Sequence, residues 1–213
     1  MLGISWFWFY GAIFLAQLPA FTQRVLGGDE HVFTLLLALF SIGIGIGSLM
    51  CERLSGHRVE LGLVPFGSIG LSLFAVDLWL ATRQMNAVTV GGIAAFVAAA
   101  GSWRVAIDIV LLGVFGGFYT VPLYALIQAR SQPSHRSRII AANNILNALF
   151  IIASAGVAIG LLSAGLSIPQ LFLVVGVMNA LVAACIYTLV PEFLLRFLAW
   201  LPGRRSAATH DEP

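Results

Sequence analysis

The stretch G-S-L-M-C-E-R-L-S-G-H-R-V-E, residues 47–60, decides how the chain is organised. It holds two acids, two arginines and a histidine in fourteen residues, whereas the runs 32–50 and 61–76 on either side hold no charged residue. A polar segment between two long apolar runs is typical of a tight loop that joins two membrane-spanning helices. The remaining spans can be counted outward from this hairpin.

The composition is that of an integral membrane protein. The 213 residues are 60% hydrophobic and 9% charged, with a mean hydropathy of +0.97, whereas soluble domains have about 25% charged residues. We therefore expect an all-α membrane protein. The net charge of +2 is too small to indicate a nucleic-acid partner. The two isolated cysteines have neither a disulfide pattern nor metal-ligand spacing, so we expect no metal and no cofactor.

Six apolar stretches are long enough to cross a bilayer, which takes about twenty helical residues. We expect residues 1–191 to form one six-helix unit with these spans: 4–26, 31–50, 61–80, 104–128, 139–163 and 168–190. The last span begins with S-I-P-Q, in which Ser167 is a helix cap, Pro169 lies in the first turn and Gln170 follows three residues after the cap. Residues 192–213 should form an amphipathic tail on the cytoplasmic surface.

Glycines in the second span predict close helix packing. Gly43 and Gly47 lie four residues apart and so face the same side, where small residues let a neighbouring helix approach closely. Gly156 and Gly160 repeat this spacing in the fifth span.

The apolar run 87–100 leaves two topologies open. Its fourteen residues are more typical of an interfacial or re-entrant segment than of a span. All eleven basic residues are arginines. If the run does not cross, eight of them share one side of the membrane and three lie on the other. If it crosses, the arginines of the loop 129–138 and of the tail are separated from those of the hairpin. The positive-inside tendency favours the first topology, with both termini cytoplasmic.

Four polar residues inside the spans are candidates for a substrate cavity. Gln17 and Arg24 lie seven residues apart on one helical face. Arg24 either meets an anionic phosphate in a cavity wall or extends to the outer surface from the end of its helix. Asn143 and Asn147 lie four residues apart at the inner end of the fifth span, where they bond either a neighbouring helix or a lipid head group.

Three charged residues predict an intramembrane ion pair. Asp77 and Asp108 lie near the outer ends of the third and fourth spans, and Arg104 precedes Asp108 by one helical turn. We expect Arg104 to pair with Asp108, with Asp77 nearby, because such a pair neutralises charge locally. The alternative role for these residues is proton coupling.

The hairpin resembles the helix-loop-helix signature of the major facilitator superfamily, which sets a small residue, an acid, an arginine, a glycine and a further basic residue in order. Gly47, Glu52, Arg53, Gly56 and Arg58 supply those residue types. Two of the intervals are one residue longer than in the common form. The resemblance implies half of a twelve-helix fold, with Glu52 and Arg53 as a latch of the cytoplasmic gate.

Three stretches carry a more specific resemblance: S-W-F-W-F-Y-G-A at 5–12, C-E-R-L-S-G-H at 51–57 and S-H-R-S-R-I-I-A-A-N-N-I-L-N-A-L-F at 134–150. They are similar to the C-terminal half of bacterial lysophospholipid transporters, and closer still to the transporter portion of fusions with a phospholipid acyltransferase and an acyl-carrier-protein ligase. The resemblance covers about residues 4–200.

This resemblance implies a multi-pass protein of the bacterial inner membrane that moves lysophospholipid for reacylation inside. Its expected partners are the bilayer, the lysophospholipid, an N-terminal six-helix half and an acyltransferase or ligase. Two alternatives are a non-transporting membrane fragment or anchor and a facilitator for another small substrate. We expect no enzymatic activity, because no histidine is followed by an aspartate at the fifth position, as the acyltransferase partner would require.

Overall fold

The computed structural model describes residues 1–55, 60–85 and 91–200 of the chain. Within them the chain forms eight helices and no strand: α1 (Leu2–Arg24), α2 (Glu30–Ser55), α3 (Leu63–Thr82), α4 (Ile93–Ala98), α5 (Ser102–Arg130), α6 (Arg136–Ser163), α7 (Ile168–Leu189) and α8 (Glu192–Trp200). Six of them, all except α4 and α8, are long and apolar enough to cross a membrane. The all-α, six-span architecture predicted from the sequence is confirmed.

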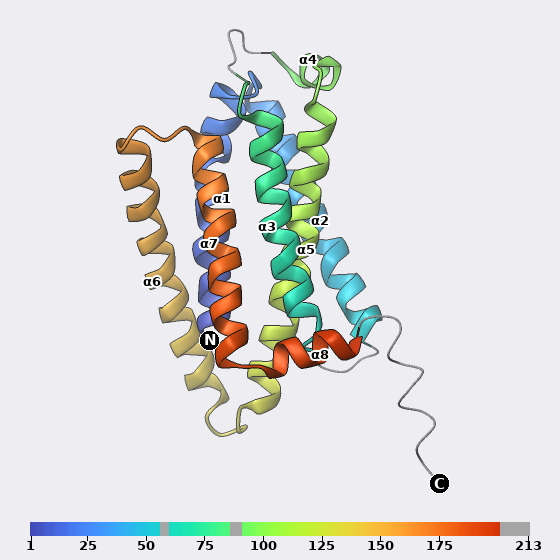
Figure 1. The fold of residues 1–213 in the computed structure, drawn as a ribbon, viewed down its shortest axis with the longest axis vertical. Helices are drawn as coiled ribbons and strands as arrows, with labels where there is room; N and C mark the ends of the chain where they lie inside the picture. Colours follow the sequence, from blue (N-terminus) through green and yellow to red (C-terminus); the bar gives the residue numbers. More distant parts are fainter. Residues whose placement is uncertain (56–59, 86–90, 201–213) are drawn as a thin grey trace.

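The short helix α4 lies at the end of the bundle where α3 ends and α5 begins (Figure 1). Its six residues extend about 9 Å, far less than the roughly 30 Å of hydrocarbon that a span must cross. The Gly91 N–H donates to the Gly27 carbonyl at 2.8 Å, and the Asp29 N–H donates to the Gly91 carbonyl at 3.0 Å. These bonds attach the segment to the turn after α1, so α4 does not traverse the bundle.

The opposite end of the bundle carries α8 and the start of α1 (Figure 1). We call the two ends the α4 end and the α8 end. A Cβ placed on Gly62 would lie 2.8 Å from the Arg196 carbonyl oxygen, so the turn before α3 meets the α8 backbone directly. The Trp200 ring lies 5.7 Å from that of Phe66. The amphipathic segment expected at the start of the tail is thus a helix packed across the bundle.

Helices α2 and α5 pack backbone against backbone through glycines. A Cβ on Gly47 would lie 2.8 Å from the Val114 Cα, and one on Gly117 would lie 2.8 Å from the Ser48 nitrogen. The close approach predicted for Gly43 and Gly47 is confirmed, since Gly43 meets the α5 backbone in the same way. The other glycine pair differs, because Cβ atoms on α6 at Gly156 and Gly160 would meet nothing within 4 Å.

Aromatic stacking joins α1 to α7 in the core. The Phe14 and Phe172 rings stack at 4.3 Å, and Phe21 meets Phe172 edge-on at 5.2 Å. The predicted capping box at the start of α7 is confirmed: Ser167 and Gln170 exchange side-chain and backbone hydrogen bonds. This cap fixes where α7 begins beside the end of α6, at the α4 end.

Candidate substrate site

A cavity of about 360 Å³ opens at the α4 end between the end of α1, the end of α3 and the turn from α6 to α7. Its polar lining includes Gln17 and Arg24 of α1, and Thr82 and Arg83 at the end of α3. Leu162 and Leu166, together with further apolar residues, form the opposite wall. The cavity therefore offers polar and apolar surface to one ligand.

Two arginines give this cavity a positive mouth. Among the described lining residues none is acidic, and Arg24 forms no ion pair within the described chain. The Arg83 guanidinium lies 5.4 Å from the Trp79 ring centroid, a cation–π contact that leaves its N–H groups open to a ligand. Guanidinium groups bind phosphate through paired, charge-assisted hydrogen bonds. The arrangement suits an amphiphile with an anionic head group.

Two other cavities suit an anionic ligand less well. One of about 430 Å³ lies at the α8 end, where Arg130 lines it. The Glu192 carboxylate, however, already accepts two hydrogen bonds from that guanidinium, at 3.0 and 3.2 Å. The second, of about 520 Å³, is a groove between α3 and α7, and no charged residue lines its described surface. Of these three cavities, the one lined by Arg24 and Arg83 has guanidinium groups that form no ion pair with a described residue.

The four residues expected to share a cavity do not meet in one place. Gln17 and Arg24 line the cavity at the α4 end, whereas Asn143 and Asn147 are buried between α6 and α1. Asn147 lies 2.8 Å from the Ser5 Oγ. Ser5 precedes Arg24 by nineteen residues on α1, or about 28 Å of helix. The asparagine pair thus occupies a helix contact near the α8 end.

The asparagine pair forms part of a polar contact across three helices. The Asn147 amide bonds Ser5 of α1 at 2.8 Å and donates to the Tyr124 hydroxyl of α5 at 3.5 Å. Turned over, the same amide would instead accept from the Trp8 Nε1 at 3.2 Å and donate to Ser5. Either orientation gives the buried Asn147 amide protein partners, as apolar surroundings require, whereas the Asn143 Oδ1 is buried without a hydrogen-bond partner among the described residues.

Arg104 pairs with Asp77 of α3 rather than with Asp108 of its own helix. Its Nε donates to the Asp77 Oδ2 at 3.0 Å, and a second guanidinium nitrogen donates to Oδ1. The expected Arg104–Asp108 pair is therefore replaced by a link between helices. The physical reason is geometric, because Asp77 presents both oxygens to the planar guanidinium, whereas Asp108 is 1% exposed inside the bundle.

Of the described hairpin residues, Glu52 and Arg53 lie toward the α8 end, where α2 ends (Figure 1). Gly47 packs on α5, while Glu52 and Arg53 lie exposed on the last turns of α2. Gly56 and Arg58 lie outside the described residues. The gate latch expected of Glu52 and Arg53 stays a prediction.

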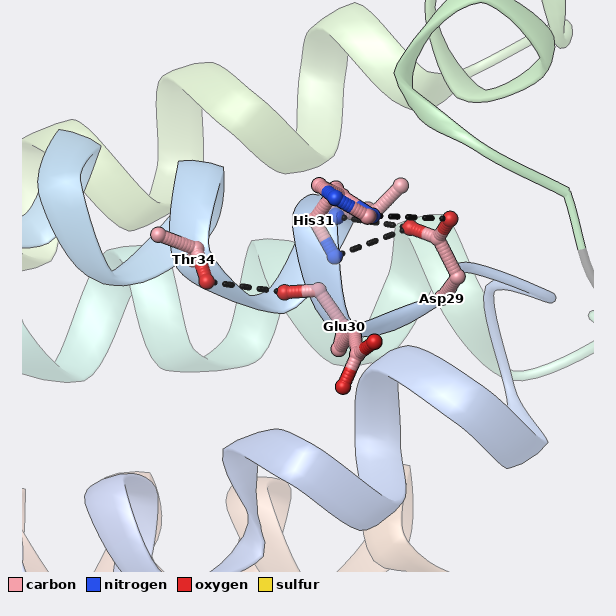
Figure 2. A network of polar contacts seen from close by, with 5 residues as sticks. Asp29, Glu30, His31 and Thr34 are labelled. Atoms are coloured by element: carbon pink, nitrogen blue, oxygen red, sulfur yellow. Dashed lines mark hydrogen bonds and ion pairs between the residues drawn. The ribbon is translucent and has the colours of Figure 1, made fainter.

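Asp29 caps the start of α2. Its Oδ1 accepts from the backbone N–H groups of His31 at 2.9 Å and Val32 at 3.1 Å, and its Oδ2 lies 3.3 Å from the His31 Nδ1 (Figure 2). The Val32 hydrogen bond, helped by His31, holds the pKa of Asp29 below its ordinary value. An aspartate directly before an apolar helix was the available signal.

Arg83 and Thr82 are the site residues that the sequence analysis missed. Arg83 follows α3 and gave no local signal beyond its charge. It joins the site only because α3 ends beside α1 and the start of α7. Among the described residues, no group of three or more His, Cys, Asp or Glu side chains could hold a metal ion.

Comparison with known proteins gives one informative likeness. The chain is 28% identical over 138 residues to the lysophospholipid transporter LplT of Serratia proteamaculans (strain 568). The alignment covers 63% of this chain and 29% of the Serratia protein, so the chain matches less than a third of that relative's length. No family model and no solved structure matches the chain. With its six membrane-length helices, this similarity identifies the chain as a multi-pass membrane protein related to a transporter.

Proposed function

We propose that the chain is one six-helix half of a secondary transporter, of the major facilitator type, that moves lysophospholipid across the bacterial inner membrane for reacylation. The observation that carries the proposal is the cavity at the α4 end, where Arg24 and Arg83 face an apolar wall in a chain similar to a lysophospholipid transporter. A lysophospholipid has one phosphate and one acyl chain, which match these two kinds of surface.

The size of the cavity supports binding of the head group rather than of the whole lipid. A volume of about 360 Å³ is near the lower limit of pockets that hold small ligands. We expect the phosphate to lie between Arg24 and Arg83 and Gln17 to bond a polar head-group atom. The acyl chain would leave along Leu162 and Leu166 toward the surrounding lipid.

Helices α2 and α6 support the idea of a half that pairs with another. They are the least buried of the six spans and expose large apolar side chains, including Ile42 and Ile46 on α2 and Ile145 and Ile152 on α6. Transporters of this type bind substrate between two helix bundles that rock against each other. In the proposal, an N-terminal half covers the exposed faces of α2 and α6, Glu52 and Arg53 latch the cytoplasmic gate, and both termini face the cytoplasm.

The test is uptake of radiolabelled lysophosphatidylethanolamine by spheroplasts of a strain without its own lysophospholipid transporter. The chain is expressed alone and together with an N-terminal six-helix half, and uptake is expected only with both. Arg53→Ala is expected to reduce uptake, whereas Arg138→Gln, an exposed arginine away from both proposed sites, is the matched control. Uptake indistinguishable from vector-only cells under both conditions would contradict the proposal and favour a non-transporting anchor.

A further inference from the structure

The Asp108 carboxyl is buried without a countercharge of its own. Its side chain lies in the contact between α5 and α3, 1% exposed, and its Oδ2 has no hydrogen-bond partner among the described residues. A carboxylate in such surroundings is strongly disfavoured, because nothing replaces the water that it loses. A protonated carboxyl avoids this cost.

The guanidinium nearest to Asp108 is already committed. Arg104 gives Asp77 a bond of 3.0 Å from Nε and a second bond from a terminal nitrogen. Asp108 lies within hydrogen-bonding reach of Asp77 as well. Two carboxyl groups so close can bond only if one carries a proton. One arginine, one carboxylate and one carboxylic acid make the cluster neutral.

Within the described part of the chain, no further charged group compensates Asp108. Asp77 of α3 and Arg104 of α5 are the groups whose charges act on it. Helix α4, which also packs on α5, carries no charged residue. The described charged residues of the other helices packed on α5 do not contribute: Arg24 of α1 and Glu30, Glu52 and Arg53 of α2.

We propose that Asp108 and Asp77 form a proton-binding site that holds one proton, carried by Asp108, and that this proton is the ion coupled to transport. The coupling of this proton to transport rests on the proposed function. The side chain of Asp77 is 32% exposed and that of Arg104 is 51% exposed. A proton from water at the α4 end can therefore reach Asp108 through Asp77.

Loss of the proton would leave one negative charge in an apolar helix contact. The cluster can restore neutrality only if Arg104 moves toward Asp108 or if the contact between α3 and α5 opens to water. Either change rearranges the α4 end, beside Arg83 at the cavity mouth. Protonation and the shape of the site are thereby linked.

Infrared spectroscopy of the full chain in lipid nanodiscs tests the site without requiring transport. Wild-type protein at neutral pH is expected to show the C=O band of a protonated carboxylic acid, which shifts in heavy water. The band should be absent from Asp108→Asn and retained in the matched control Asp29→Asn, an aspartate outside the spans. Absence of the band from the wild type, or its persistence in folded Asp108→Asn, would overturn the proton site. The wild-type spectrum decides the matter even if the variant does not fold.

Uptake measured with and without an inward proton gradient tests the coupling. With an N-terminal half present, the gradient should accelerate wild-type uptake of lysophosphatidylethanolamine several-fold and leave the Asp108→Asn rate unchanged. A wild-type uptake rate that is the same with and without the gradient would overturn the coupling of the proton to transport. The infrared band would in that case still support the proton-binding site. Failure of wild-type uptake under every condition counts against the proposed function, and thus against coupling, but leaves the infrared result as the test of proton binding.

Discussion

Replacing Gly47 by alanine should destabilise the bundle. The added Cβ would lie 2.8 Å from the Val114 Cα and nearer still to the Val114 carbonyl oxygen, and backbone atoms of α5 cannot move aside as a flexible side chain can. Overpacking of this kind costs about 1–3 kcal/mol. For a chain of this length, each kcal/mol lowers the unfolding midpoint by about 2–4 °C. We expect a midpoint about 2–12 °C below that of the wild type.

The matched control is Gly45→Ala in the same helix, where the added Cβ meets nothing within 4 Å. That change should be neutral or raise stability by up to about 1 kcal/mol, because alanine favours a helix more than glycine does. Cys51 is 3% exposed and four residues from Gly47, whereas Cys185 is exposed. In a Cys185→Ser background, heating the protein with a thiol-reactive dye therefore reports the opening of the α2–α5 contact through Cys51. Equal midpoints for Gly45→Ala and Gly47→Ala would refute the reasoning.

Three further predictions concern charged groups at the two ends of the bundle. Arg24→Gln should raise the KM for lysophospholipid uptake about tenfold or more, as expected for loss of a charge-assisted bond to phosphate, and unchanged kinetics would exclude Arg24 from the site. Hydrogen bonds from Arg130 hold the pKa of Glu192 below its ordinary value of 4.5, so this pair stabilises α8 at any pH above 4.5 and ceases to do so as the pH falls through the lowered value. Circular-dichroism melts should thus show less acid destabilisation for Glu192→Gln than for the wild type. Asp29→Ala should lower the melting midpoint by a few degrees through loss of the α2 cap, and Asp29→Asn, which keeps an acceptor oxygen, should lower it less.

Sequence reasoning identified the features that depend on local chemistry. The six spans follow from apolar runs of about twenty residues, because lipid requires the backbone to bond within each helix. The capping box of Ser167 and Gln170 was predictable because its two partners are three residues apart. The packing of Gly43 and Gly47 was predictable as a close approach, although the identity of the partner helix was not.

The candidate site was only partly predictable. Gln17 and Arg24 could be assigned to one face because they share a helix, and both line the same cavity. Asn143 and Asn147 were assigned to the same cavity only because they are polar residues inside a span. In the tertiary structure they contact α1 about five helical turns from Arg24. Arg83 could not have been found, because its position beside α1 depends on how α3 packs.

The sequence by itself determined that this is a six-span helical protein, since hydropathy, glycine spacing and arginine placement are properties of neighbouring residues. Only the tertiary structure decided which charges meet. Arg104 bonds Asp77, twenty-seven residues away, rather than Asp108 one turn along its own helix, and Asp108 is left buried. The reason is that pairing between helices depends on their packing, which brings side chains together regardless of their separation in the chain.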